Sequence, residues 1–425
     1  MKAIFAASLA ALALPAAPLA AQQRTPAQVA DAALRAAPVF DGHNDVPEAL
    51  RDRYRNVIAD FDFTDSSKAP AVDGGPVGMH TDLARLRRGR VGAQFWSVYV
   101  SASLPEPQAV VAVLEQIDVM KRLIARHPAE LAFVTTAAQA EAAMKRGRIA
   151  SLLGMEGGNS IGESLAVLRQ TYDLGARYLT LTHSKTLSWA DSATDAPRHG
   201  GLTEFGRKVV REMNRLGMLV DLSHVSEATM MDALDETRAP VIFSHSGARA
   251  IDGHPRNVPD SVLARLPANG GVVMAVAYPA FLSEAYRQWS AERAGETARL
   301  ASLHPGDPGA VTAGVAAWTA AHPRPVATLA QWADHIDHIR KLAGIDHVAL
   351  GGDYDGMEIG PQGAEDVAGY PALFAELARR GWSRADLEKI SSRNIMRVLR
   401  NAEAVAASQR GLAPLETPAV GTAAQ

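Results

Sequence analysis

The chain has 425 residues, of which 47% are hydrophobic and 21% charged, so it can bury a sizeable core and stay in solution. Its formal net charge is −3 and it contains no Lys/Arg-rich run, so it lacks the basic surface that nucleic-acid binding requires. Nucleic acid is therefore excluded as an expected partner. Length alone allows several domains or one α/β barrel.

The first 23 residues combine one Lys, an apolar stretch and small residues before a polar pair, which is typical of a secretory signal peptide. We predict a signal peptide over residues 1–21. The stretch is short for a bilayer span and Pro15 and Pro18 interrupt it, which disfavours an uncleaved anchor. There is no cysteine, so neither a lipidated cysteine nor a disulfide framework is available. We expect an exported protein, periplasmic or secreted, without a membrane anchor.

Short apolar runs recur along the chain, and each ends in a polar or charged cluster. Continuous apolar strands that alternate with amphipathic helices predict a parallel sheet buried on both faces, and eight repeats favour closure into a (β/α)₈ TIM barrel over residues 22–404. A doubly wound open sheet is the alternative fold. The expected strands are 37–45, 91–100, 149–158, 177–183, 217–224, 240–246, 271–278 and 347–356, and helices are expected at 107–127, 202–217 and 328–344.

Two segments depart from this rhythm. Residues 279–327 are rich in Ala, Pro and Arg and too long for an ordinary loop, so we expect an inserted lid or helical excursion over the barrel mouth. Residues 405–425 lack periodicity and are expected to form a disordered tail.

Ionisable residues fall at the ends of six of the expected strands. Because the carboxyl ends of barrel strands converge on one mouth, these side chains are expected to share one site. The residues are His43 and Asp45, Glu156, His183, His224, His245, and Asp353 with Asp355.

Each motif alone is weak evidence for a metal site, and the interpretation depends on their repetition at successive strand ends. His43 and Asp45 have the period-2 spacing that points both side chains to one side of a strand. Glu156 lies between glycines after an apolar run, where a carboxylate is costly to bury unless it binds a cation. Imidazole and carboxylate ligands without thiolate suit zinc, with manganese or cobalt as alternatives, and the set fits a binuclear metal site. The remaining histidines considered, expected at the surface, are His127, His304, His322, His335 and His338.

The ordered motifs DGHNDVP, GMEGG, YLTLTHS with WADS, DLSH, SHS, RNVPD and GGDYDG resemble the membrane (renal) dipeptidases, from about Asp41 to Arg397. That family is a barrel of the amidohydrolase superfamily with two zinc ions, and it hydrolyses dipeptides, often with a D-residue at the C-terminal position. The resemblance implies a zinc-dependent dipeptidase that works through a hydroxide bridging the metals.

Residue by residue, the resemblance implies a metal site with one bridging carboxylate. His43, Asp45 and Glu156 would hold the first ion, and Glu156, His224 and His245 the second. Asp353 would lie near the first ion and transfer the proton. His183 would polarise the scissile carbonyl, and Arg256 would pair with the substrate's carboxylate, unless it only ties its loop down through a salt bridge.

The sequence departs from the animal members in having no cysteine, so their disulfide-linked dimer is not expected and a non-covalent homodimer stays open. It also shows no hydrophobic lipid-attachment tail. Two other functions are weighed. One is a binuclear amidohydrolase acting on another small amide, an N-acyl amino acid or a lactone, for which Arg256 is the discriminator. The other is a binding protein without catalysis, which the presence of Asp353 and His183 argues against.

Overall fold

The computed structural model describes Ala3 and residues 24–72 and 75–418. Apart from Ala3, the predicted signal peptide lies outside the described residues, as do residues 419–425 of the predicted tail.

Eight parallel strands close into a barrel. Their order is β1-β2-β4-β5-β6-β7-β8-β9, and β9 pairs with β1 to complete the ring. The predicted TIM barrel is therefore confirmed, and the open doubly wound sheet is wrong. The strands are β1 (Val39–Asn44), β2 (Val91–Tyr99), β4 (Ile149–Glu156), β5 (Ala176–Thr180), β6 (Leu219–Asp221), β7 (Ile242–Ser246), β8 (Val272–Ala275) and β9 (Val348–Leu350).

A ninth strand, β3 (Leu131–Phe133), was not among the predicted ones. It pairs with the first residues of β4, whereas β5 pairs with the remainder of that strand. Three residues without a polar terminus carry no periodic signal, so the sequence did not reveal it.

The barrel interior is filled by side chains. Alternate positions of the strands contribute to one apolar cluster, which includes Phe40, Phe95, Leu152, Tyr178 and Met274, all fully buried. A larger cluster fills the space between the strands and the surrounding helices. Because the interior is packed, the loops at the carboxyl ends of the strands are the place for a site.

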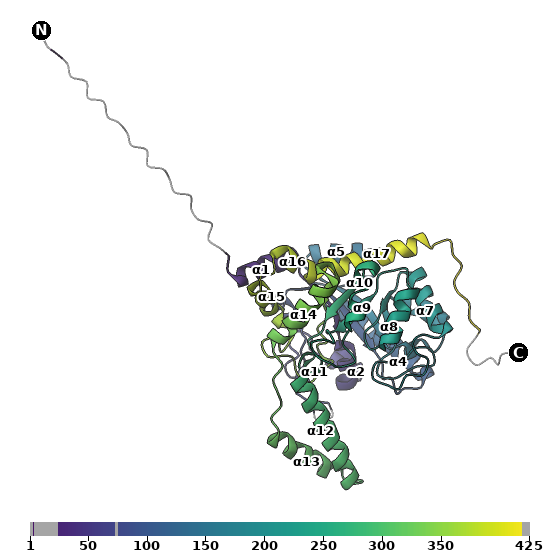
Figure 1. Ribbon diagram of the computed structural model, residues 1–425, viewed down its shortest axis with the longest axis vertical. Coiled ribbons are helices and arrows are strands. Elements are labelled where there is room, and N and C mark those ends of the chain that lie inside the picture. Colours follow the sequence, from purple (N-terminus) through teal and green to yellow (C-terminus); the bar gives the residue numbers. More distant parts are fainter. Residues whose placement is uncertain (1–2, 4–23, 73–74, 419–425) are drawn as a thin grey trace.

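Helices surround the barrel (Figure 1). No helix of the described residues is long and apolar enough to cross a bilayer. The helices are α1 (Pro26–Ala36), α2 (Val46–Tyr54), α3 (Leu83–Arg88), α4 (Glu106–Arg126), α5 (Ala137–Lys145), α6 (Leu165–Leu174), α7 (Glu204–Leu216), α8 (Glu227–Glu236), α9 (Asp260–Leu263), α10 (Leu266–Asn269), α11 (Pro279–Leu282), α12 (Glu284–Leu303), α13 (Pro308–Ala321), α14 (Leu329–Ala343), α15 (Tyr370–Arg379), α16 (Arg384–Glu388) and α17 (Asn394–Ser408).

Residues 279–327 form the predicted helical excursion. Helices α12 and α13 pack against each other and extend away from the barrel on the side of α2 and α11 (Figure 1). Trp289 on α12 donates a hydrogen bond to His322 O at 2.8 Å, and its ring lies 6.1 Å from that of Trp318 on α13. Helix α13 has no buried residue, so the pair projects from the mouth side instead of lying flat over it.

The C-terminal helix α17 runs to Ser408, past the predicted start of the tail at residue 405. Farther along, the backbone N–H of Leu415 donates to Glu212 Oε2 at 3.2 Å, and Arg169 donates to the carbonyl of Leu415 at 3.1 Å. The chain therefore stays attached to α7 beyond the predicted boundary.

Candidate active site

The ends of six strands and the loops that follow them bring the predicted residues together. His43 lies in β1, Glu156 ends β4 and His245 lies in β7. Asp45 is the N-cap of α2, directly after β1. His183, His224 and Asp353 are each the third residue after the end of a strand, β5, β6 and β9 respectively.

Glu156 lies at the centre of this group. Its Oε1 lies 2.8 Å from His224 Nε2 and 3.4 Å from His245 Nε2, and its Oε2 lies 3.3 Å from His43 Nε2. His183 Nε2 is farther, at 3.8 Å from Oε1. Burial opposes the charge of Glu156, but His43 and His224 outweigh it and hold the pKa of this carboxyl well below its usual range. An ionised carboxylate thus faces imidazoles with both of its oxygens.

A second group forms beside it. His43 Nε2 lies 3.4 Å from Asp45 Oδ2 and 3.9 Å from Asp353 Oδ1. Gly356 borders these carboxylates, because a Cβ at that position would approach Asp45 Oδ2 to 2.4 Å and Asp353 Oδ1 to 2.8 Å. Any residue larger than glycine would fill the space that the two carboxylates face.

The donor set fits divalent cations. Three sets of residues could each hold a metal ion, because the ligand atoms within a set lie within 4.8 Å of one another. The sets are His43, Glu156 and His245; Glu156, His183 and His224; and His43, Asp45 and Asp353. His43 Nε2 and Asp45 Oδ1 are buried and have no hydrogen-bond partner among the described residues, as expected for atoms that await a cation.

The imidazoles of the second predicted ion are suited to ligation. Burial, with Arg256 nearby, lowers the pKa of His224, and burial beside His43 lowers the pKa of His245. Both therefore offer neutral rings, which is the form that binds a metal.

Buried partners orient the ligands. Tyr178 OH lies 2.9 Å from His43 Nδ1, and Ser97 Oγ donates to Glu156 Oε2 at 3.0 Å. His245 Nδ1 lies 2.9 Å from Ser244 Oγ, which in turn donates to Asp221 Oδ2 at 2.6 Å. Such contacts fix which ring nitrogen points into the site and strengthen the ligands.

The backbone is strained where the ligands turn inward. His224 and Asp353 have φ values of 68° and 62°, in the left-handed region that non-glycine residues rarely adopt. Gly157, next to Glu156, has φ 102°, a conformation that glycine adopts at little cost. Strain of this kind concentrates at functional sites.

Asp353 and His183 have environments that suit proton transfer and carbonyl binding. Burial beside Asp45 raises the pKa of Asp353 well above its usual value, which makes this carboxylate a better proton acceptor. Burial lowers the pKa of His183, so its ring is neutral at pH 7. The ring lies 4.6 Å from that of Tyr99 and 4.2 Å from that of His224.

Arg256 is fully buried beside His245, one of the candidate metal-binding residues. It donates to Ser246 Oγ at 3.3 Å and to His245 O at 3.1 Å, while its Nε has no partner among the described residues. Burial lowers its pKa to about 10, although Asp353 and Glu156 act against this. Within the described part of the chain no carboxylate lies within 4.0 Å, so the salt bridge considered as an alternative is absent.

Some predicted residues lie elsewhere. Asp355 accepts a hydrogen bond from the backbone N–H of His80 at 2.7 Å and is outside the three ligand groups. His335 is fully buried, so the prediction that it lies at the surface is wrong. Its Nδ1 accepts from Ala248 N–H at 2.9 Å and its Nε2 donates to Leu282 O at 3.3 Å. Its place on an amphipathic helix with acidic neighbours did not reveal that it faces the barrel.

Glu48 and Tyr99 also lie near these residues, and neither was predicted from the sequence. Glu48 is in the first turn of α2, three residues after Asp45, and the aromatic Tyr99 ends β2. Electrostatic effects of Glu48 and Glu156 add to burial in raising the pKa of Tyr99, so all three lie near one another. The only signal was an acidic residue directly after the HNDVP motif.

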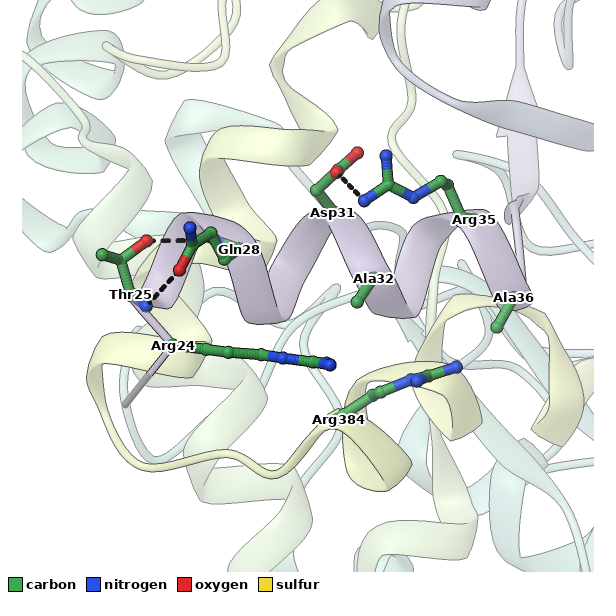
Figure 2. A pocket seen from close by; sticks show the side chains of 8 residues that line it. All are labelled: Arg24, Thr25, Gln28, Asp31, Ala32, Arg35, Ala36 and Arg384. Atoms are coloured by element: carbon green, nitrogen blue, oxygen red, sulfur yellow. Dashed lines mark hydrogen bonds and ion pairs between the residues drawn. The ribbon is translucent and has the colours of Figure 1, made fainter. Parts of the chain in front are cut away.

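A large surface hollow of about 760 Å³ lies away from this chemistry, against α1 and Arg384. Helix α1 was not predicted, although Thr25 and Gln28 form a capping box at its start. Figure 2 shows that Thr25 and Gln28 each accept a hydrogen bond from the other's backbone N–H, and that Asp31 pairs with Arg35. Because α1 precedes β1, this hollow is at the amino ends of the strands.

A closed parallel barrel with imidazoles and carboxylates converging at the carboxyl ends of its strands defines a metal-dependent hydrolase of the amidohydrolase type. The family described as membrane dipeptidase (Peptidase family M19) matches residues 27–411. The chain belongs to this family and is a metal-dependent dipeptidase.

Proteins similar to this chain are described as dipeptidases or metallopeptidases. Dipeptidase 3 of Macaca fascicularis is 41% identical over 392 residues, covering 91% of this chain and 70% of that protein. Human Dipeptidase 3 is 40% identical, with the same coverage. A metallopeptidase from Rhodobacter sphaeroides, solved with a phosphinate mimic of the dipeptide L-Ala-D-Ala, is 25% identical with a TM-score of 0.68, over 86% of this chain and 99% of that one. The probable dipeptidase PvdM from Pseudomonas aeruginosa, at 24% identity, TM-score 0.75 and coverage of 90% and 99%, shares the fold.

Proposed function

We propose that this protein is a zinc-dependent dipeptidase with two metal ions, which cleaves dipeptides that carry a free C-terminal carboxylate, including those with a D-residue there. The Rhodobacter relative, which binds a mimic of L-Ala-D-Ala, supports the stereochemical part of this proposal. The single observation that carries it is Arg256, a buried guanidinium beside the metal ligands without an ion-pair partner.

Burying a cation costs free energy unless an anion accompanies it. Arg256 is fully buried, and its hydrogen bonds go to a hydroxyl and a carbonyl, neither of which is charged. The carboxylate of a bound dipeptide would supply the missing charge, and a planar guanidinium is suited to bind it through two hydrogen bonds.

Zinc is proposed from the donor chemistry. His43, Asp45 and Glu156 would hold one ion, with Asp353 beside it, and Glu156, His224 and His245 would hold the other. These imidazole and carboxylate ligands without thiolate suit Zn²⁺, although the ligand types also admit Mn²⁺ or Co²⁺. When bound, such ions supply Lewis acidity that activates water and polarises a carbonyl.

The remaining steps are assigned to side chains. Asp353, whose pKa is raised, would accept the proton of the attacking water and deliver it to the departing amine nitrogen. His183, with a neutral ring at the edge of the site, would donate a hydrogen bond to the carbonyl oxygen as negative charge develops on it.

The alternative function is hydrolysis of another small amide or of a lactone by the same site. A lactone without a carboxylate gains nothing from Arg256, so substrate preference separates the two functions.

The test combines metal analysis with a substrate panel. We expect about two divalent ions per chain, loss of activity on chelation and recovery with zinc, cobalt or manganese. Free dipeptides, L-L and L-D, should be cleaved well, and amidated dipeptides and tripeptides poorly. Equal cleavage of amidated or longer peptides would overturn the dipeptidase proposal, and full activity of verified metal-free protein would overturn the metal mechanism.

We also propose that the protein is exported, on the composition of residues 1–21 alone. Fractionation of cells that express the full chain, with N-terminal sequencing of the mature form, tests this. An intact N-terminus in the cytoplasmic fraction contradicts it.

A further inference from the structure

Glu48 is an acidic residue at the mouth of the barrel that no ligand group includes. It occupies the third position of α2, and Asp45 is the N-cap of that helix. Side chains in the first turn of a helix lean toward its N-terminus, which here is the end that carries Asp45. Glu48 is half-buried, and it lies outside the three groups of ligand atoms.

The capping-box role of a glutamate at this position is not available to Glu48. In a capping box its carboxylate would accept the N–H of the N-cap residue. The N–H of Asp45 instead donates to Tyr354 O at 2.9 Å, and α2 has no side-chain cap.

The helix neighbours of Glu48 do not neutralise it. Arg51, one turn along α2, donates to Glu115 at 2.7 Å, and Asp52 carries the same charge as Glu48. Among the described residues Glu48 makes no hydrogen bond and no ion pair within 4.0 Å. Burial, and then Asp45, Asp52 and Glu156, raise the pKa of Glu48 well above its usual value, so a cation that binds beside Glu48 would offset the repulsion among these acids.

Glu48 and Arg256 give the site a polarity. Asp353 and Glu156 are within electrostatic range of both residues, and Glu48 and Arg256 enter from different elements, α2 after β1 and the loop after β7. The site therefore combines one unpaired anion and one unpaired cation among the described residues, and the two enter it from different elements. A dipeptide is a zwitterion whose scissile bond lies between an ammonium and a carboxylate, so its charges match this arrangement.

We propose that Glu48 is a specificity-determining residue that binds a positive charge on the N-terminal residue of the dipeptide. The assignment rests on the proposed dipeptidase function, with Arg256 binding the other end. The cation is an ammonium or guanidinium group, supplied by the α-amino group or by a basic side chain.

The experiment measures binding of unreactive ligands to metal-loaded protein by calorimetry. The probes are phosphinate dipeptide analogues of three kinds: an Ala-Ala type with its α-amino group, the same compound without that group, and a Lys-Ala type. The variant is Glu48→Gln, which keeps size and removes charge. Asp52→Asn is the matched control, because it removes an exposed negative charge from the same helix.

We expect Glu48→Gln to weaken a cationic analogue by about tenfold or more, as for other hydrogen bonds between charged groups. Affinity for the des-amino analogue should stay within about twofold, and Asp52→Asn should change neither. A loss with the Ala-Ala type assigns the contact to the α-ammonium, and a loss with the Lys-Ala type alone assigns it to a basic side chain. Metal content and thermal unfolding of the variant verify its fold, and Glu48→Asp, which keeps the charge, should recover part of the affinity.

Two results overturn the assignment: unchanged affinity for every cationic analogue, or an equal loss for the des-amino compound. Both leave the dipeptidase function intact if the wild type still binds the analogues and cleaves dipeptides. A wild type that binds none of them removes the proposed function, and the role of Glu48 falls with it.

Discussion

The two ends of the barrel use charged residues in opposite ways. At the amino ends of the strands, Arg35 and Asp31 are 63% and 38% exposed and pair with each other, and Arg90 also reaches Asp31 at 3.2 Å. At the carboxyl ends, the side chains of Asp45 and Glu156 are 4% and 5% exposed and face the imidazole of His43.

This difference separates stability from function. Exposed pairs of opposite sign cost little and contribute little. Buried carboxylates that face one another are unfavourable, and such a group persists where a ligand compensates it. The arrangement of charge therefore indicates that the functional site lies at the carboxyl ends of the strands, although the large surface hollow lies at their amino ends.

The largest effect is expected at the mouth, from Asp353→Asn. The amide keeps the shape of the side chain but cannot take a proton, so turnover should fall on the order of 10²-fold or more with a small change in KM. Steady-state kinetics on a free dipeptide measures this. The matched control is Asp355→Asn, whose side chain bonds to His80 and should keep turnover within a fewfold. A similar loss in both variants would contradict the distinction between the two aspartates.

Arg256→Ala should act on specificity. The wild type should prefer a free dipeptide to its C-terminal amide, and the variant should lose most of this preference. A charge-assisted contact corresponds to roughly ten- to a hundredfold in kcat/KM. The ratio of kcat/KM for the two substrates is the readout, because it cancels a general loss of activity. An unchanged ratio in the variant would mean that the carboxylate binds elsewhere.

His335 provides a stability test just behind the mouth. Burial lowers its pKa from 6.5 to about 4. Its Nδ1 accepts the N–H of Ala248, so a second ring proton would also point at that N–H. The folded pKa is below the unfolded one, so its contribution is present above pH 6.5 and is lost as the pH falls toward 4. The loss is on the order of 3 kcal/mol.

Urea unfolding between pH 4 and 7 measures this effect. The difference between wild type and His335→Gln isolates it from pH-dependent metal release. The exposed His304→Gln is the control and should follow the wild type. Parallel curves for the wild type and His335→Gln would show that His335 does not carry this pH dependence.

The smallest effect is expected at the opposite end. Arg35→Ala removes an exposed ion pair and should change the free energy of unfolding by less than about 0.5 kcal/mol. Turnover should not change. Urea unfolding and dipeptide kinetics check both statements, and a clear fall in turnover would show that the two ends are coupled.

The sequence predicted the barrel and the residues at its mouth for the same reason. Buried parallel strands are continuous apolar runs, and a polar residue at the end of such a run stands out, as Glu156 and His245 do. The outer helix α1 was not predicted because it precedes the repeating pattern. Strand β3 was not predicted because it has only three residues.

The side chains that were misjudged or missed depend on neighbours distant in sequence. His335 looks like a surface residue on its helix, and its partners, Ala248 and Leu282, come from other segments. In the sequence Glu48 looks like an ordinary acidic residue in the first turn of a helix. The structure shows that the N–H of Asp45 donates to Tyr354 O, so Glu48 has no capping role. Asp353 and Asp355 are two residues apart, yet one faces His43 and the other His80.

The sequence by itself determined the fold class, the family motifs and the set of residues available for chemistry, because periodicity and residue type are local properties. Only the tertiary structure decided which of these side chains meet and which are left without a partner. It also decided that the unpaired acid Glu48 and the unpaired base Arg256 lie near the same residues. The physical reason is that pairing, burial and pKa depend on distances between segments, and barrel closure sets those distances.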